Sequence, residues 1–86
     1  MASYRVDITR SVEKELEALA VKDHRRVVTR MRALAGDPRP HGCEKLSGEE
    51  KYRLRQGDLR IVYEIADPEL TVTIVKVGHR RDVYSR

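Results

Sequence analysis

The 86-residue sequence predicts a single α+β domain over residues 1–86, with two helices packed on one face of a small sheet. Three observations lead to this fold class. Apolar and polar residues alternate near the N-terminus, two apolar stripes at helical spacing follow, and the second half holds β-branched runs separated by short turn sequences. The expected order is therefore a strand, an αα-hairpin and three antiparallel strands.

The first strand is predicted at residues 4–8, where Tyr4, Val6 and Ile8 share one face. Thr9 or Ser11 can then cap a helix. The apolar stripe of this helix consists of Val12, Leu16, Leu19 and Ala20. We expect this stripe to face the sheet.

A second helix is predicted after Asp23, which we expect to be its N-cap. Its apolar stripe consists of Val27, Val28, Met31, Leu34 and Ala35. Gly36 is expected just after the helix end, and Pro38 and Pro40 prevent its continuation. Because only two or three residues separate the helices, they should form an αα-hairpin that packs on a sheet.

Three strands are predicted in the second half, at residues 51–56, 59–65 and 70–77. The first two flank Gly57 and Asp58, and glycine at the first position of a two-residue loop is typical of a type II′ hairpin. Asp67 and Pro68 form the next turn. All three strands should therefore be antiparallel neighbours.

The predicted hairpin places Arg55 opposite Arg60, with Arg53 on the same face. Tyr52, Leu54, Ile61 and Tyr63 then share the other face. Opposed like charges cost a hairpin up to about 1 kcal/mol, which favours a polyanion bound to this face. The alternative is that acids such as Glu64 screen solvated arginines. In either case the register predicts that Arg60 points to solvent.

Composition favours a partner that carries phosphate or acidic groups. The chain has 18 Lys and Arg residues against 14 Asp and Glu residues, a net charge of +4. The second predicted helix carries Arg25, Arg26, Arg30 and Arg32, which would bind RNA through its backbone or form a solvated face. A single cysteine, Cys43, excludes an internal disulfide, and no His, Cys, Asp and Glu cluster has metal-ligand spacing. We expect no metal or cofactor, and without an apolar run for membrane insertion or a signal peptide we expect a cytoplasmic protein.

A run of reactive side chains follows the last predicted strand. Gly78 at the strand end should expose His79, Arg80, Arg81 and Tyr84. RNA cleavage without a metal needs the 2′-OH deprotonated, the charge of the pentacovalent intermediate stabilised and the leaving oxygen protonated. Arginine, histidine and tyrosine suit these tasks, and tyrosine also stacks on bases. The alternative is a basic tail with one packed tyrosine.

The chain resembles the RelE/ParE superfamily of bacterial toxins over essentially its whole length. Four blocks carry the resemblance, namely LAGDPRPHG at 34–42, KLSG at 45–48, YRLRQGDLRIVYEI at 52–65 and VGHRRDVY at 77–84. The resemblance, closest to the RelE branch, implies the α+β fold derived above, a type II toxin and no cofactor. It also implies a cognate acidic and partly disordered antitoxin, through which alone operator DNA would be bound.

For the RelE branch, the resemblance implies metal-independent mRNA cleavage in the ribosomal A site by attack of the 2′-OH. The family's basic residues of the hairpin fall on Arg53, Arg55 and Arg60, its arginine after the final glycine on Arg80, and its C-terminal tyrosine on Tyr84. Arginines replace the lysines that the family often has at 53 and 55. Weaker catalytic candidates are His79, Arg81 and Lys45.

Two alternatives stay open at this point. One is a ParE-like inhibitor of DNA gyrase, which lacks the nuclease residues and has no use for Tyr84. The other is a degenerate toxin that acts only as a corepressor with its antitoxin.

Overall fold

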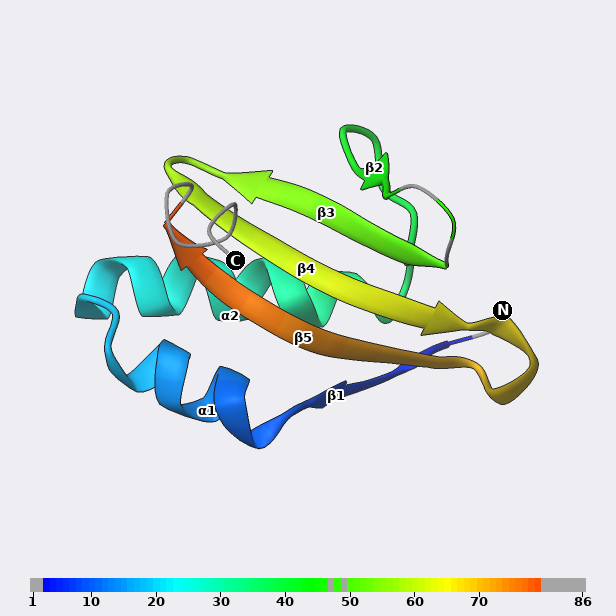
Figure 1. The fold of residues 1–86 in the computed structure, drawn as a ribbon, viewed down its shortest axis with the longest axis horizontal. Coiled ribbons are helices and arrows are strands. Elements are labelled where there is room, and N and C mark those ends of the chain that lie inside the picture. Colours follow the sequence, from blue (N-terminus) through cyan, green and yellow to red (C-terminus); the bar gives the residue numbers. More distant parts are fainter. Residues whose placement is uncertain (1–2, 47, 49, 80–86) are drawn as a thin grey trace.

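The structure is a computed structural model that describes residues 3–46, 48 and 50–79. Its elements in chain order are β1 (Arg5–Ile8), α1 (Arg10–Glu17), α2 (Val21–Ala33), β2 (Glu44–Lys45), β3 (Lys51–Gln56), β4 (Leu59–Ala66), a 3₁₀ turn (Asp67–Glu69) and β5 (Thr71–His79) (Figure 1). The α+β class and the order of a strand, two helices and three long strands are confirmed.

The strands form one five-stranded sheet in the order β1-β5-β4-β3-β2. β1 pairs with β5 in parallel, while β5, β4, β3 and β2 are antiparallel neighbours. The sequence did not predict β2, whose two residues pair with Tyr52 and Arg53, nor the parallel pairing of the first strand with the last. The sheet is therefore mixed.

The boundaries of the helices differ in part from the prediction. Thr9 caps α1 as expected, since its side chain accepts a hydrogen bond from the Val12 N–H at 3.2 Å. Asp23 is not the cap of α2, which begins at Val21 after Ala20. Asp23 instead lies in the first turn, where a carboxylate also interacts favourably with the helix dipole.

Gly36 does not end α2 in the predicted way. The helix ends at Ala33, and the positive-φ glycines of the described residues are Gly42, Gly48 and Gly57. The N–H groups of Leu34, Ala35 and Gly36 bond to the carbonyls three residues earlier. These tighter bonds satisfy the helix C-terminus, so a left-handed glycine is not needed.

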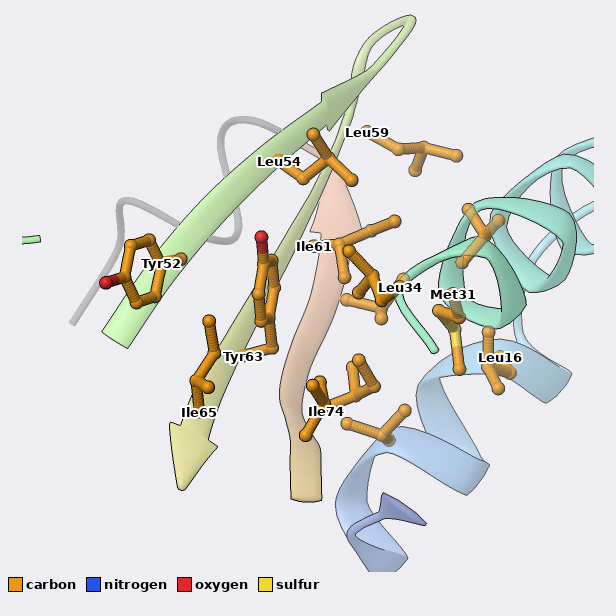
Figure 2. Close-up of a cluster of buried hydrophobic side chains, with 14 residues drawn as sticks. Leu16, Met31, Leu34, Tyr52, Leu54, Leu59, Ile61, Tyr63, Ile65 and Ile74 are labelled. Atoms are coloured by element: carbon orange, nitrogen blue, oxygen red, sulfur yellow. The ribbon is translucent and has the colours of Figure 1, made fainter. Parts of the chain in front are cut away.

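The core lies between the helices and one face of the sheet (Figure 2). Ile61 points from the sheet towards Leu34 and Met31 of the helical layer (Figure 2). The buried ring of Tyr63 lies beside it and donates its hydroxyl hydrogen to the Pro38 carbonyl at 2.9 Å. The stripes are confirmed at Val12, Leu16, Val27, Met31 and Leu34, whereas Val28, Leu19 and Ala35 are half-buried and Ala20 is exposed. The hairpin arginines lie on the opposite face of β3 and β4, together with Lys51, Val62 and Glu64.

β5 extends further than predicted. It runs through Gly78 to His79, so Gly78 lies inside the strand and pairs with Arg60 instead of turning the chain. A β-bulge interrupts the β4–β5 register between Val62 and Tyr63. Glu15 of α1 accepts a hydrogen bond from the Val77 N–H at 2.8 Å, which fixes the helix to the outer edge of β5. The end of the last strand is thus held by both β4 and α1.

Candidate active site

The hairpin of β3 and β4 has the predicted register. Arg55 pairs with Arg60 and Gln56 with Leu59 across the two-residue loop. Gly57 has φ +60°, while Asp58 is not among the positive-φ residues, which fits a type II′ turn. This local geometry places two arginines side by side on adjacent strands.

A cavity of about 520 Å³ lies beside this hairpin. Its lining consists of four arginines, one glutamate, one leucine and two glycines: Arg30, Arg53, Arg55, Arg60, Glu44, Leu54, Gly42 and Gly57. The three hairpin arginines predicted to act together do line one site. Arg30 joins them from α2, although the sequence placed it only on a helix face for RNA.

Arg60 is buried, which corrects the prediction that it points to solvent. Its exposed fraction is 4%, and it is the only buried charged residue among those the structure describes. Its neighbour in the β4–β5 register is Gly78, which brings no side chain to that position. Strand alternation gave the correct face for Arg60 but not its depth.

The Arg60 guanidinium is under-satisfied. One terminal nitrogen, Nη1, donates to the Leu59 carbonyl at 3.3 Å, and Nε is buried with no partner in the described part of the chain. Arg30 also has a buried Nε without such a partner. An unsatisfied buried donor costs about 1–3 kcal/mol, and more when it is charged. Both arginines line the cavity, so their positive charge is suited to an anion there.

Glu44 is the acid that faces these arginines, and the sequence did not point to it. Arg53 Nε donates to the Glu44 carboxylate at 3.1 Å, and a second nitrogen of Arg53 also contacts it. Arg53, and more weakly Arg55 and Arg60, hold the pKa of Glu44 below its ordinary value. Glu64, considered above as the screening acid, instead lies 3.9 Å from Lys51. A two-residue strand such as β2 leaves no pattern by which the pairing of Glu44 could be predicted.

The predicted RNA-binding arginines of α2 lie in two settings. Arg25, Arg26 and Arg32 are exposed, and Arg30 is half-buried. A second hollow of about 330 Å³ is lined by Arg25, Arg26, Thr29, Arg30 and Gln56. Because Arg30 lines both hollows, the cationic surface continues from the hairpin to α2.

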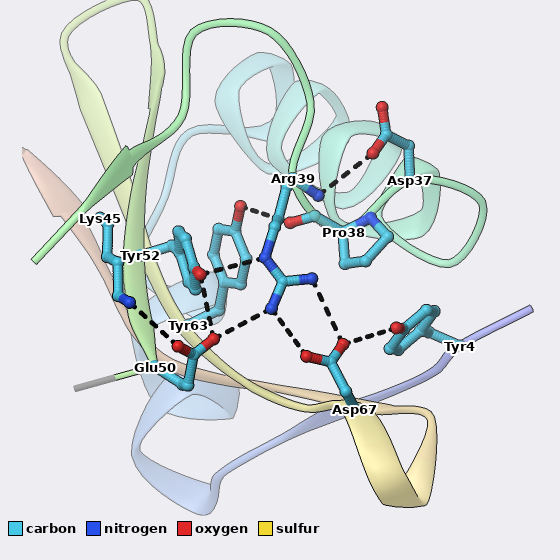
Figure 3. Close-up of polar contacts among 9 residues, drawn as sticks. All are labelled: Tyr4, Asp37, Pro38, Arg39, Lys45, Glu50, Tyr52, Tyr63 and Asp67. Carbon is cyan, nitrogen blue, oxygen red and sulfur yellow. Dashed lines mark hydrogen bonds and ion pairs between the residues drawn. The ribbon is translucent and has the colours of Figure 1, made fainter.

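Lys45, a weaker catalytic candidate, belongs to a different cluster (Figure 3). It forms an ion pair with Glu50 at 3.0 Å. Arg39 binds Glu50 and Asp67 at 2.9 Å each and the Tyr52 hydroxyl at 3.0 Å. Lys45 and Arg39 lower the pKa of Glu50, and Arg39 lowers that of Asp67. This network ties the loop before β2 to the sheet and does not line the arginine cavity.

The C-terminal candidates are only partly covered by the structure. His79 is exposed at the end of β5, opposite Leu59 and next to the Arg60–Gly78 pair. Arg80, Arg81 and Tyr84 lie outside the described residues. His79 therefore lies at the same strand end as Arg60.

The cavity is suited to hold a phosphate group and to stabilise negative charge on it. Arginine presents five donors in a planar fork, which matches the oxygens of a phosphate two at a time. The arginines cannot accept a proton, and the lowered pKa of Glu44 makes it a weak acceptor. The described lining thus supplies electrostatic stabilisation, with proton transfer left to other groups.

The family model for the ParE toxin of the type II toxin–antitoxin system parDE matches residues 6–84. The chain belongs to this toxin family. The sequence resemblance to the RelE/ParE superfamily is therefore confirmed, although the matching model is that of ParE and not of RelE. A search of curated proteins gave no match.

Solved structures of RelE toxins are similar to the toxin. The RelBE2 toxin–antitoxin complex of Mycobacterium tuberculosis matches with a TM-score of 0.82 and 29% identity, covering 93% of this chain and 94% of that chain. The RelE–RelB complex of Pyrococcus horikoshii OT3 matches with a TM-score of 0.79 and 28% identity, covering 91% and 96%. The isolated Escherichia coli RelE toxin, at 24% identity, a TM-score of 0.79 and coverage of 95% and 92%, shares the fold.

Two further properties concern only the part of the toxin that the structure describes. Neither of its helices is long and apolar enough to cross a membrane. No three of its histidine, cysteine, aspartate or glutamate side chains gather where they could hold a metal ion.

Proposed function

We propose that this type II toxin is a ribosome-dependent, metal-independent mRNA endonuclease of the RelE kind, acting in the cytoplasm. The observation that carries the proposal is Arg60, a buried guanidinium with an unpaired Nε in a cavity that three other arginines line. A cavity with this composition is suited to the scissile phosphate of RNA.

In the proposed reaction the 2′-OH attacks the adjacent phosphate. It loses its proton, the bond to the leaving 5′-oxygen breaks, that oxygen takes up a proton, and a 2′,3′-cyclic phosphate results. Arg60 and Arg80 hold the phosphate and stabilise its extra charge, while Arg53 and Arg55 orient the 2′-OH and neighbouring phosphates. Tyr84 stacks on a base or takes part in proton transfer, and His79 is a candidate for protonating the leaving oxygen.

Binding of the strand extends beyond the scissile phosphate in this proposal. The second hollow, lined by Arg25 and Arg26, shares Arg30 with the arginine cavity. A neighbouring phosphate of mRNA, or a phosphate of ribosomal RNA, fits this continuous basic surface. Arg32, which is exposed on the same helix, adds to the long-range attraction.

We also propose that a cognate antitoxin neutralises the toxin. The net charge of +4 and the arginine cavity suit an acidic, partly disordered chain that folds on binding. The M. tuberculosis and P. horikoshii relatives were both solved as complexes with antitoxins. Operator DNA would be bound through the antitoxin.

A second candidate function is inhibition of DNA gyrase, because the matching family model is that of ParE. Induction of the toxin in bacterial cells separates the candidates. New mRNA 5′ ends within translated frames, absent for an Arg60→Met variant, are the result expected for the nuclease. DNA breaks with an SOS response and intact mRNA would contradict it and indicate the gyrase inhibitor. Normal growth at full expression would indicate a degenerate toxin that acts as a corepressor.

A further inference from the structure

Glu44 stands out in the arginine cavity because it is the one acidic residue of the described lining. It lies on β2 opposite Arg53 of β3, and its carboxylate accepts the Arg53 Nε–H at 3.1 Å. Another Arg53 nitrogen donates to the same carboxylate oxygen. The fork of Arg53 that would bind a phosphate is thus turned towards a carboxylate of the protein itself.

The charge of Glu44 is coupled to the whole hairpin cluster. Its pKa is lowered mainly by Arg53 and further by Arg55 and Arg60, so the carboxylate is ionised under ordinary conditions. By reciprocity, the carboxylate reduces the positive potential that these three arginines present to another anion. Glu44 and a bound phosphate therefore compete for the same positive charge.

The Glu44 side chain is not required to hold β2 in place. Lys45 pairs with Tyr52 in the β2–β3 register, and the Leu46 N–H donates to the Lys51 carbonyl at 2.8 Å. The Glu44 side chain is 58% exposed, so the carboxylate can turn into solvent when it loses Arg53. It has the position and the freedom of a displaceable counter-ion.

We infer that Glu44 is the resident anion of the arginine cavity: it occupies Arg53 in the free toxin, gives way to the substrate phosphate and thereby sets the phosphate affinity of the site. The inference rests on the proposed function, since it assigns a specificity-determining residue of that same site. A single phosphate gains little binding free energy, because it must displace Glu44 from Arg53 and forms one ion pair in exchange. A polynucleotide gains further contacts in the second hollow with Arg25 and Arg26, so the site favours a strand over free phosphate.

The test is a titration of the isolated full chain with inorganic phosphate, followed by NMR at the Nε–H groups of Arg53 and Arg60. Glu44→Gln removes the charge and keeps the shape. Glu64→Gln is the matched control, because it makes the same change in net charge at an acid that pairs with Lys51 outside the cavity. We expect Glu44→Gln to bind phosphate about three- to tenfold more tightly, and Glu64→Gln to differ by less than about twofold from the parent.

A double-mutant cycle tests the part of Arg53. In an Arg53→Gln background, Glu44→Gln should strengthen phosphate binding by less than about twofold. An unchanged gain in that background would show that Glu44 does not act by occupying Arg53, and would overturn the inference. Equal gains for Glu44→Gln and Glu64→Gln would overturn it too, because they would reflect net charge alone.

Equal phosphate binding by the parent and Glu44→Gln, or no binding by either, also contradicts the inference. Its failure is distinguishable from failure of the proposed function, because the titration needs neither ribosome nor mRNA. A toxin that leaves mRNA intact, yet binds phosphate more tightly as Glu44→Gln and not as Glu64→Gln, would retain the inferred role of Glu44 and lose the nuclease.

Discussion

Replacement of Arg60 by methionine is expected to make the protein more stable and less active at the same time. Methionine is unbranched and flexible, so it fills the space of the arginine stem without a charge. Arg60 is 4% exposed, and its Nε has no partner in the described residues. Replacing a residue that stabilises the fold lowers the free energy of unfolding, whereas replacing a residue that serves a ligand does not.

The expected gain follows from three local terms. Removal of the unsatisfied charged donor returns about 1–3 kcal/mol. Loss of the contact from Nη1 to the Leu59 carbonyl, at 3.3 Å, takes back about 1 kcal/mol. Relief of the like-charge pair with Arg55 adds up to about 1 kcal/mol. The net gain in stability lies between about 0 and 3 kcal/mol, and its centre near about 1.5 kcal/mol corresponds to a rise in Tm of roughly 6–12 °C for a domain of this size.

Two measurements on the same variant check this. Thermal unfolding gives the shift in Tm, with Arg55→Met as a control that removes the like-charge pair from an exposed position. Because Arg55 has no desolvation to relieve, its variant gains at most the like-charge contribution of about 1 kcal/mol, so its rise in Tm should be smaller than that of Arg60→Met. Cleavage of mRNA on ribosomes should fall about 100- to 1000-fold for Arg60→Met, the usual loss for a positioned charge stabiliser.

A Tm lowered by several degrees in Arg60→Met would show that the guanidinium stabilises the fold and would refute the reasoning from its burial. Unchanged cleavage would refute its role at the phosphate. The two measurements are independent, because Tm tests the effect of Arg60 on stability and cleavage tests its role at the phosphate.

Three more predictions follow from the structure. Arg39→Met should lose about 1–2 kcal/mol at pH 7 in urea denaturation. Because the pKa values of Glu50 and Asp67 are lowered in the folded state, the ion-pair part of this difference should be full above their ordinary values of 4.5 and 3.8 and should be lost as the pH falls through the lowered ones, while the part from the Tyr52 contacts remains. A difference as large in strong acid as at pH 7 would contradict the ion pairs of the network. Gly57→Ala should cost about 1–2 kcal/mol through its positive φ alone, as nothing lies within 4 Å of the added Cβ, whereas Gly36→Ala, made at ordinary φ, should be neutral or slightly stabilising. Association with the antitoxin, measured by stopped flow, should slow as salt rises, and a rate that is flat in salt would mean that apolar contacts carry recognition.

Local rules predicted the hairpin because its turn is local. Gly57 supplies the positive φ that a two-residue loop needs, and once the loop is placed every cross-strand pair follows. The pairing of Arg55 with Arg60 and the stacking of Tyr52 on Tyr63, with ring centroids 5.8 Å apart, are consequences of that one position.

Local rules could not predict how deeply a side chain is buried or which distant segments pair. Alternation places Arg60 on the outer face, but its burial depends on what lies beside it there, including Gly78 from the far end of the chain. Arg30 was assigned to a helix face, while the cavity it lines is completed by the hairpin. Glu44 reaches Arg53 through a pairing of two residues, too short for a pattern in sequence. The site is formed by segments that are distant in sequence, and no one of them carries a pattern that predicts it.

The parallel pairing of β1 with β5 also determines when the sheet of the toxin can be completed. β1 is made before the other described strands, yet its only partner in the sheet is β5, so it cannot pair until all of those strands have been made. Long-range contacts of this kind form late, after loop closure has brought the ends together. On the proposed function, a growing chain lacks part of the arginine site's surroundings until Gly78 of β5 has been made. A nascent chain should therefore not cut RNA before the strand that carries Gly78 has emerged from its ribosome.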